Sequence, residues 1–394
     1  MSLTQRETGD KVYYDIVVTN LATINKPPPT LYFQETRNSP FVLDPESYYL
    51  SIVRFSLDTP TLPVIQPEIQ PNQGNRNLTT YSITLSWTNP IAPFQTFNQQ
   101  EYLIYSPQDL AAVVPAPPSL TNTKLQNNDT GYYDVYNYQY FIYLVNQTFN
   151  TAFSNLNAQV VGAGLVLPTT YAPIMDWNTG DNTAVITADQ AGYDDTSANY
   201  IKIYFNPSMY QLFSSFPIII EGFAAGLGKN VRIVTNTFGG ANIVQYPPVA
   251  PTYTGLQIYQ EYSTISLWTP VTSIVFTSNT LPVVTNQLSA PLLFYDGSQF
   301  VGSGNNANVQ QVVTDFVADE AKYKPTLIYE PSAEYRLVDL VGNRPLYTFD
   351  LNVYYKNRVG QLIPFRLSSG STATIKILFT RKGSDAKAKS IALR

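Results

Sequence analysis

Apolar and polar residues alternate along residues 334–382, near the end of the chain. Large apolar or aromatic side chains stand at every second position of 347–355, with polar side chains between them. The alternation returns over 372–380, where only Leu378 interrupts the polar side. Because successive side chains of a strand point to opposite faces, both runs predict strands with one buried face. Turn-forming triplets separate the runs, so this stretch predicts an antiparallel sheet.

The same criteria predict strands in most other parts of the chain. They fall at residues 12–19, 48–57, 79–88, 201–205, 265–276 and 292–295, and the apolar run Ile218–Ile220 is expected to be buried. Pro90 and Pro93 stop one of these strands. The pattern as a whole predicts an all-β protein whose sheets have one solvent-exposed face and one buried face.

One long helical pattern interrupts the strands. Apolar residues recur at intervals of three and four from Phe141 to Leu156, which predicts an amphipathic helix over residues 138–157. A short helix is also predicted at 107–114, because Pro107 suits a first helical turn and the negative charge of Asp109 would be stabilised by the helix dipole there. Another short helix is predicted to open at Asn206-Pro207-Ser208 and to run through Phe216, before Pro217.

Composition narrows the possible functions. Charged residues make up only 13% of the 394 positions, against about 25% in an average globular protein. Neutral polar residues, 30 tyrosines and 29 prolines take their place. A neutral surface costs less to desolvate than one of Lys and Glu, which favours a protein that contacts many neighbours. A β protein rich in turns explains the prolines and threonines equally well.

The chain contains no cysteine and no histidine. This excludes disulfides, thiol nucleophiles, Cys/His zinc sites and a Ser-His-Asp triad. A glycosidase that uses two carboxylates remains possible, but no pair such as Glu261 with Glu330 can be singled out. We therefore expect no catalytic residue, no metal site and no cofactor.

The net charge of −5 argues against nucleic-acid binding by the main part of the chain. The exception is the C-terminal tail, whose basic residues are Arg381, Lys382, Lys387, Lys389 and Arg394. Such a tail either contacts a packaged genome weakly or is simply solvated. No apolar run reaches the length of a membrane span, so no membrane span is expected.

Three segments suggest binding sites, each with a plainer explanation. Tyrosines over 132–143 suit stacking on carbohydrate or packing in a core. Five aspartates over 176–195 suit a calcium loop or ordinary turns. Residues 222–230 resemble a phosphate loop, but Phe223 and Asn230 replace residues that the motif needs, so a glycine-rich hairpin connection is the better interpretation.

Two strands partly repeat one another. Ser51-Ile52-Val53 with Phe55 resembles Ser273-Ile274-Val275-Phe276, and a similar Thr-Leu-Pro-Val follows each. The repeat suggests a duplicated β module or two equivalent strands that face each other.

With these strands in view, the chain resembles jelly-roll capsid proteins of DNA viruses, above all the minor (penton, vertex) capsid proteins of virophages and polinton-like viruses. The segments that carry the resemblance are 48–55, 203–206, 360–365 and 375–379. The resemblance implies a viral jelly-roll β-sandwich, pentamers at icosahedral vertices and no catalysis. The helix-bearing middle leaves two forms open: a single roll with an insertion, or two rolls in tandem.

We accordingly expect residues 1–100 with 256–382 to form the jelly roll. Residues 101–255 would be a mixed insertion or second β domain, and 383–394 a flexible basic tail. The expected function is a structural protein of the virion capsid, namely the pentameric penton (vertex, minor capsid) protein, which self-associates into pentamers or other symmetric capsomers and contacts neighbouring capsid proteins. A double jelly-roll major capsid protein forming trimers, and a receptor- or carbohydrate-binding β-sandwich, are the alternatives.

Overall fold

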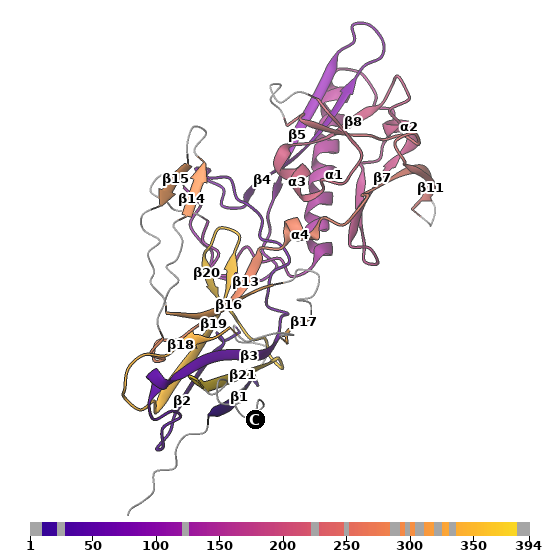
Figure 1. Cartoon of the computed structure of the whole chain (residues 1–394). Helices are drawn as coiled ribbons and strands as arrows, with labels where there is room; N and C mark the ends of the chain where they lie inside the picture. Colours follow the sequence, from indigo (N-terminus) through magenta and orange to yellow (C-terminus); the bar gives the residue numbers. More distant parts are fainter. Residues whose placement is uncertain are drawn as a thin grey trace, which may run out of the picture. The chain divides into compact units, whose positions relative to one another are not determined.

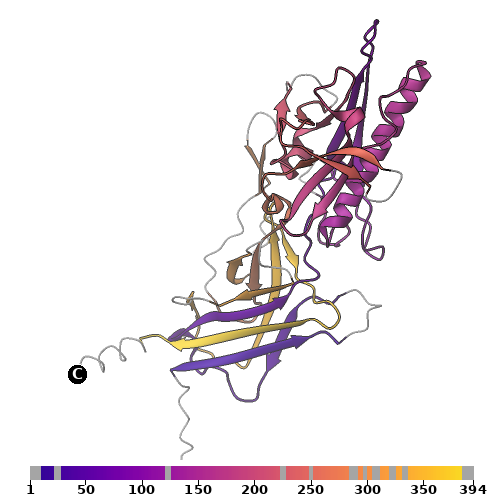
Figure 2. The ribbon, with the colours of Figure 1, turned by 90° about the vertical axis from the view of Figure 1, so that its right-hand side faces the viewer.

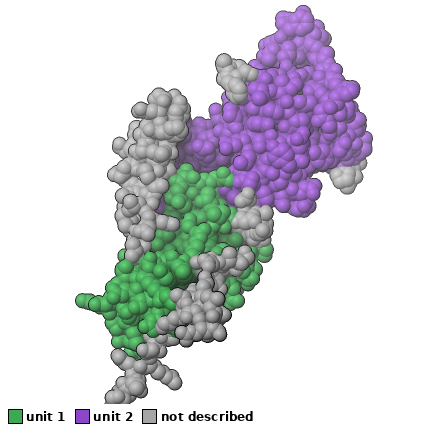
Figure 3. Space-filling view, in the orientation of Figure 1, with its two compact units in different colours: residues 1–62, 270–394 green, residues 63–269 purple. Residues whose placement is uncertain are grey.

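The computed structural model describes residues 10–21, 28–119, 126–221, 228–247, 252–283, 292–295, 300–303, 311–318, 325–330 and 336–383. The chain divides into two compact units, coloured separately in Figure 3. Unit 1 comprises residues 1–62 and 270–394, and unit 2 comprises residues 63–269. Unit 2 is thus inserted in the sequence of unit 1.

Unit 1 consists of antiparallel strands in two main sheets (Figure 1). One sheet has the order β1-β21-β3-β17 with β18 beside β3, and the other has the order β16-β13-β19-β2 with β20 beside β19. The strands are β1 Lys11–Thr19, β2 Tyr32–Thr36, β3 Tyr48–Asp58, β13 Val271–Thr277, β16 Val312–Val317, β17 Thr326–Tyr329, β18 Val338–Asp339, β19 Thr348–Asn357, β20 Leu362–Pro364 and β21 Thr372–Arg381. The turn η1 (Pro45–Ser47) precedes β3, and β14 (Leu292–Tyr295) pairs with β15 (Phe300–Ser303) in a separate hairpin.

The strand order is that of a jelly roll. Along the two sheet paths, the strands in chain order are β1, β2, β3, β13, β16, β17, β19 and β21. One sheet takes the first, eighth, third and sixth of these, and the other takes the second, seventh, fourth and fifth. Successive strands therefore cross from one sheet to the other, except β13 and β16, which pair within one sheet, in the manner of two Greek keys. The predicted jelly-roll sandwich is confirmed, and unit 2 enters between β3 and β13.

The two similar sequence segments are equivalent strands in opposite sheets. The first lies in β3 and the second in β13. Their phenylalanines, Phe55 and Phe276, meet inside the sandwich with ring centroids 5.2 Å apart. The interpretation of two strands that face each other is therefore correct.

The C-terminal strands bury the faces that alternation predicted. Ile375, Ile377 and Phe379 of β21 lie in the sandwich core. Leu378, the exception in the pattern, points to the opposite face, where it pairs with Tyr13 and Ser51 on the flanking strands. It is nevertheless only 2% exposed, so this outer surface also shields an apolar side chain.

Unit 2 contains two more antiparallel sheets, with orders β5-β4-β8-β10-β9 and β11-β12-β7-β6. Its strands are β4 Leu78–Thr88, β5 Thr96–Ile104, β6 Ile174–Asn178, β7 Thr183–Asp189, β8 Ile201–Phe205, β9 Ile218–Ile220, β10 Val231–Ile233, β11 Asn242–Tyr246 and β12 Tyr253–Tyr259. Its helices are α1 Tyr138–Gly162, α2 Gln190–Tyr193, α3 Pro207–Leu212 and α4 Ile265–Trp268. Among the described residues, unit 1 is thus a single jelly roll. The long helix belongs to the insertion, unit 2.

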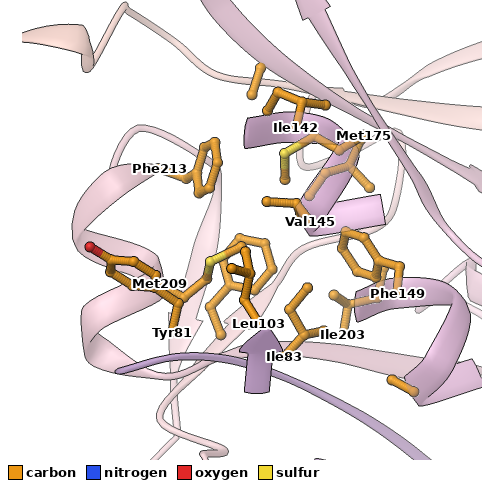
Figure 4. Packing of buried hydrophobic residues seen from close by; sticks show 14 of the residues in the cluster. Tyr81, Ile83, Leu103, Ile142, Val145, Phe149, Met175, Ile203, Met209 and Phe213 are labelled. Carbon is orange, nitrogen blue, oxygen red and sulfur yellow. The ribbon is translucent and has the colours of Figure 1, made fainter. Parts of the chain in front are cut away.

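The long helix α1 organises the core of unit 2. Asn137 caps it, since its Oδ1 accepts a hydrogen bond from the Tyr140 amide at 2.7 Å. The predicted helix is confirmed and continues five residues beyond Asn157, to Gly162. Its apolar face packs against both sheets, as the side chains in Figure 4 show around Val145 and Phe149. No helix among the described residues is long and apolar enough to cross a bilayer.

Asn206 joins helix α3 to strand β4. Its Oδ1 accepts from the backbone amides of Met209 (2.9 Å) and Ser82 (3.1 Å), and its Nδ2 donates to the Thr80 carbonyl (2.7 Å). The substitution Asn206→Ala removes a helix cap and leaves buried backbone groups without partners, so we expect it to lower the free energy of unfolding by about 2 kcal/mol. Urea unfolding measures the change. The matched variant Asn206→Asp keeps the acceptor and should lose less, whereas equal stability of Asn206→Ala and the parent would contradict this role.

Three local predictions are wrong. Residues 107–114 form only a turn, in which Asp109 Oδ1 accepts from the Ala111 amide, and the prolines that follow cannot extend it. The strand predicted at 265–276 begins only at Val271, because Ile265–Trp268 is the helical turn α4. Ile218–Ile220 is a strand but not a buried one: Ile219 is 42% and Ile220 59% exposed, because β9 is the last strand of its sheet.

The expected unit boundaries differ from those of the structure. Strand β4, the first part of β5 (to residue 100) and the last part of β12 (from residue 256) were expected in the sandwich, but all three strands belong to unit 2. The hairpin expected around 222–230 corresponds to the antiparallel pairing of β9 with β10. The tail at 384–394 lies outside the described residues.

Candidate assembly surfaces

The aspartates over 176–195 do not form a loop. Strands β6 and β7 and helix α2 occupy this segment, because the β-forming run 183–189 pairs on both sides. Asp189 instead holds local structure: its carboxylate accepts from Thr169 Oγ1 at 2.6 Å and from the Ala191 amide at 3.2 Å. Across the part of the chain that the structure describes, no three acidic side chains gather to hold a metal ion.

The tyrosines before α1 are mainly core residues. Tyr132 and Tyr133 are buried and pack with Tyr105, with the rings of the first two 5.0 Å apart. Tyr133 donates its hydroxyl to the Arg76 carbonyl at 2.9 Å, and burial raises the pKa of this phenol to about 12. Tyr143, by contrast, is 53% exposed on α1. Core packing therefore explains the first part of this segment.

Unit 2 contains a half-buried charge cluster that the sequence did not indicate. Arg232 of β10 donates to Glu221 Oε1 at 2.5 Å and contacts Asp195 Oδ2 at 3.5 Å. Tyr204 donates to the other Glu221 oxygen at 2.7 Å. Burial opposes ionisation of Glu221, but these two hydrogen bonds hold its pKa below the usual value. The cluster is internally paired, which suits a structural role.

Strand β1 leaves one edge of the sandwich open. It stands at the end of its sheet and, among the described strands, pairs only with β21. Tyr13 and Val17 on its outer face are 50% and 65% exposed. Asp15 between them contacts Lys376 Nζ at 3.5 Å, an exposed ion pair of small energetic value. A long strand that carries exposed apolar side chains and whose outer edge pairs with no other described strand is a natural contact for another chain.

The exposed face of α1 is unusually free of charge. No Asp, Glu, Lys or Arg occurs in Tyr138–Gly162. Its exposed side chains are neutral: Gln139, Tyr143, Gln147, Asn150, Thr151, Ser154, Asn155, Asn157, Ala158, Gln159 and Val161. A neighbouring protein that covers the helix therefore desolvates no charge of the helix itself, and the nearest charge shown is Glu101 of β5, whose Oε1 accepts from Asn155 Nδ2 at 2.7 Å.

The basic tail is only partly described. Its first two residues are already paired: Lys382 Nζ lies 2.8 Å from Asp339 Oδ1, and Arg381 Nη1 lies 4.0 Å from Asp10 Oδ1. Lys387, Lys389 and Arg394 lie outside the described residues. Contact of these three with a genome stays a prediction.

Comparison with known proteins decides the family. The model of the Sputnik minor capsid protein V18/19 family matches residues 12–381, which is most of both units. The chain belongs to this family. It is therefore a structural protein of the virion capsid and not an enzyme, and it assembles with other capsid proteins.

Individual relatives agree with this assignment. Structural protein V19 of Sputnik virophage is 29% identical over 202 residues, which cover 50% of this chain and 88% of that protein. Uncharacterized protein V18 of the same virophage is 31% identical over 160 residues, covering 40% and 92%.

Two solved structures share the fold. A chain of the Sputnik virophage cryo-EM structure superposes with a TM-score of 0.77 at 28% identity, covering 96% of this chain and 99% of that one. The mavirus penton protein superposes with a TM-score of 0.61 at 15% identity, covering 95% and 100%. At this lower identity the likeness concerns the fold, which includes the inserted unit as well as the jelly roll.

Proposed function

We propose that this capsid protein is the penton, a pentamer that closes the icosahedral vertices. The supporting observation is the single jelly roll of unit 1, interrupted once between β3 and β13. The mavirus penton protein shares this fold over nearly the whole of both chains. A major capsid protein with two jelly rolls would form trimers instead, and unit 2 offers a long helix and other sheet orders in place of a second roll.

The sandwich edge at β1 is the contact that we assign to subunit association. Its nine residues form a long strand without proline, and its outer face carries exposed Tyr13 and Val17. Closed rings of identical subunits bring one such edge against a different surface of the next copy. Repetition around the ring makes a modest contact stable.

Size-exclusion chromatography with light scattering tests the proposal. We expect the mass of five 44.0-kDa chains. The variant Val17→Asp, at a 65% exposed position of β1, should shift the protein toward monomer. Val359→Asp, at a 42% exposed turn position of the same unit, is the matched control and should leave the mass unchanged. A mass of three chains, or a monomer at every concentration, would contradict the penton assignment.

A further inference from the structure

The turn between β4 and β5 exposes five consecutive apolar residues. Pro90, Ile91, Ala92, Pro93 and Phe94 are all exposed, with Ile91 at 72% and Phe94 at 63%. Figures 1 and 2 show this hairpin extending beyond the other elements of unit 2. No charged residue occurs from 77 to 100. An apolar surface this exposed on a soluble domain indicates a contact site.

The stem of the hairpin holds the turn rigidly. Trp87 and Phe97 are direct cross-strand partners, buried and stacked with ring centroids 6.0 Å apart. Trp87 Nε1 also donates to Asn199 Oδ1 at 2.7 Å. One pair nearer the turn, the hydroxyls of Thr88 and Thr96 lie 3.0 Å apart. The apolar turn is thus presented ready-formed, and little conformational entropy is lost when it binds.

Three backbone amides of the turn donate hydrogen bonds within the turn itself. The Asn89 amide donates to the Gln95 carbonyl at 2.9 Å, and the Phe94 amide donates to the Ile91 carbonyl at 3.0 Å. The Ile91 amide donates to Asn89 Oδ1 at 3.2 Å. Pro90 and Pro93 have no amide proton to satisfy. Few donors would therefore lose water if the turn entered hydrocarbon, where each unsatisfied group costs several kcal/mol.

We propose that this β4–β5 turn inserts into the surface of a lipid bilayer with neutral headgroups. A protein pocket would be expected to find side-chain hydrogen bonds or charges that set orientation, and the five turn residues offer neither. A bilayer needs only apolar side chains with polar neighbours at headgroup depth. Thr88, Gln95 and Thr96, all exposed, border the turn and supply those neighbours. Because the hairpin carries no Lys or Arg, it has no positive charge that would attract anionic lipid, and neutral headgroups suit it equally well.

Insertion of one turn is weak, because only two large side chains enter the bilayer. Several copies on one particle would bind together with greatly increased avidity. The inference concerns the turn alone and does not depend on pentamer formation.

Flotation of the full-length protein with phosphatidylcholine liposomes tests the proposal. We expect the parent protein to float with the liposomes and the double variant Ile91→Ser/Phe94→Ser to lose about tenfold or more in partitioning. The matched control, Ile219→Ser/Ile220→Ser, removes two exposed apolar side chains from β9 of the same unit and should float like the parent. Because the attraction is not electrostatic, raising NaCl from about 0.1 M to about 1 M should not release the protein.

Other outcomes overturn the proposal. They are failure of the parent to float, equal flotation of the turn variant and the parent, and binding only to phosphatidylserine vesicles that disappears in high salt. A fourth is a turn variant that changes the mass by light scattering, since the turn would then contact another copy. Circular dichroism and the unfolding midpoint of the turn variant should equal those of the parent, because both substituted side chains are exposed.

Discussion

Replacement of Asp350 by alanine is expected to lower the free energy of unfolding by about 3 kcal/mol or more. This carboxylate, 2% exposed on β19, accepts hydrogen bonds from the chain just after β13. The donors are Ser278 Oγ (2.7 Å), the amides of Asn279 and Thr280 (2.9 Å each), Thr280 Oγ1 (2.8 Å) and Asn279 Nδ2 (3.1 Å). Alanine would leave the buried Ser278 hydroxyl without this acceptor and would break the hydrogen bonds that hold Asn279 and Thr280 against β19.

Urea unfolding at neutral pH measures this loss. Asn352→Ala is the matched control on the same strand: it removes a single 3.2 Å hydrogen bond to Asp350 Oδ2 and should cost less than about 1 kcal/mol. An Asp350→Ala protein as stable as the parent would show that the turn after β13 does not depend on the carboxylate.

The same carboxylate is expected to make the stability of the fold depend on pH in the acid range. Burial opposes its ionisation, but the hydrogen bonds from Ser278 and Thr280 outweigh burial and lower the pKa of Asp350. A carboxylate with a lowered folded-state pKa stabilises the fold above its unfolded pKa of about 3.9, and this contribution disappears as pH falls toward the folded pKa. Asp350→Asn should therefore be less stable than the parent at pH 7, with the difference shrinking below about pH 4. A constant difference across this range would contradict the assignment.

Replacement of Phe55 by alanine is expected to cost about 3–5 kcal/mol. Phe55 is 1% exposed and joins the two sheets of the jelly roll: its ring centroid lies 5.2 Å from that of Phe276 and 5.0 Å from that of Phe316. Alanine would leave a cavity between sheets that cannot collapse without shifting both. Chemical denaturation of unit 1 measures the loss. Ile328→Ala, 64% exposed on β17 of the same sheet, should change stability by less than about 1 kcal/mol, and a similar effect of both variants would contradict this account.

Several elements were predictable because their signals are local. Alternation in β19 and β21 marks which side chains enter the sandwich, and the spacing of apolar residues marks the buried face of α1. The errors have a different origin. The burial of Ile218–Ile220 depends on whether another strand or sheet covers β9, and the aspartates over 176–195 could not be separated from ordinary turns without knowing that β7 has partners on both sides. Neither fact is present in the residues themselves.

For the candidate contact surfaces too, the sequence supplies one part of the information and the structure supplies the other. The lack of charge from 77 to 100 and in α1 is a property of the sequence. Only the structure places Pro90 to Phe94 on an exposed turn and shows that β1 pairs, among the described strands, with β21 alone.

By itself, the sequence determined the β character, the long helix and the absence of Cys and His chemistry, since composition and short-range periodicity carry that information. The tertiary structure alone decided that Phe55 meets Phe276, that Asp350 is buried among the donors after β13, and that the sandwich is a single roll split by an insertion. These features depend on contacts between residues about 70 to 220 positions apart. Which of these distant residues meet depends on the packing of the whole chain, so a local sequence pattern does not show it.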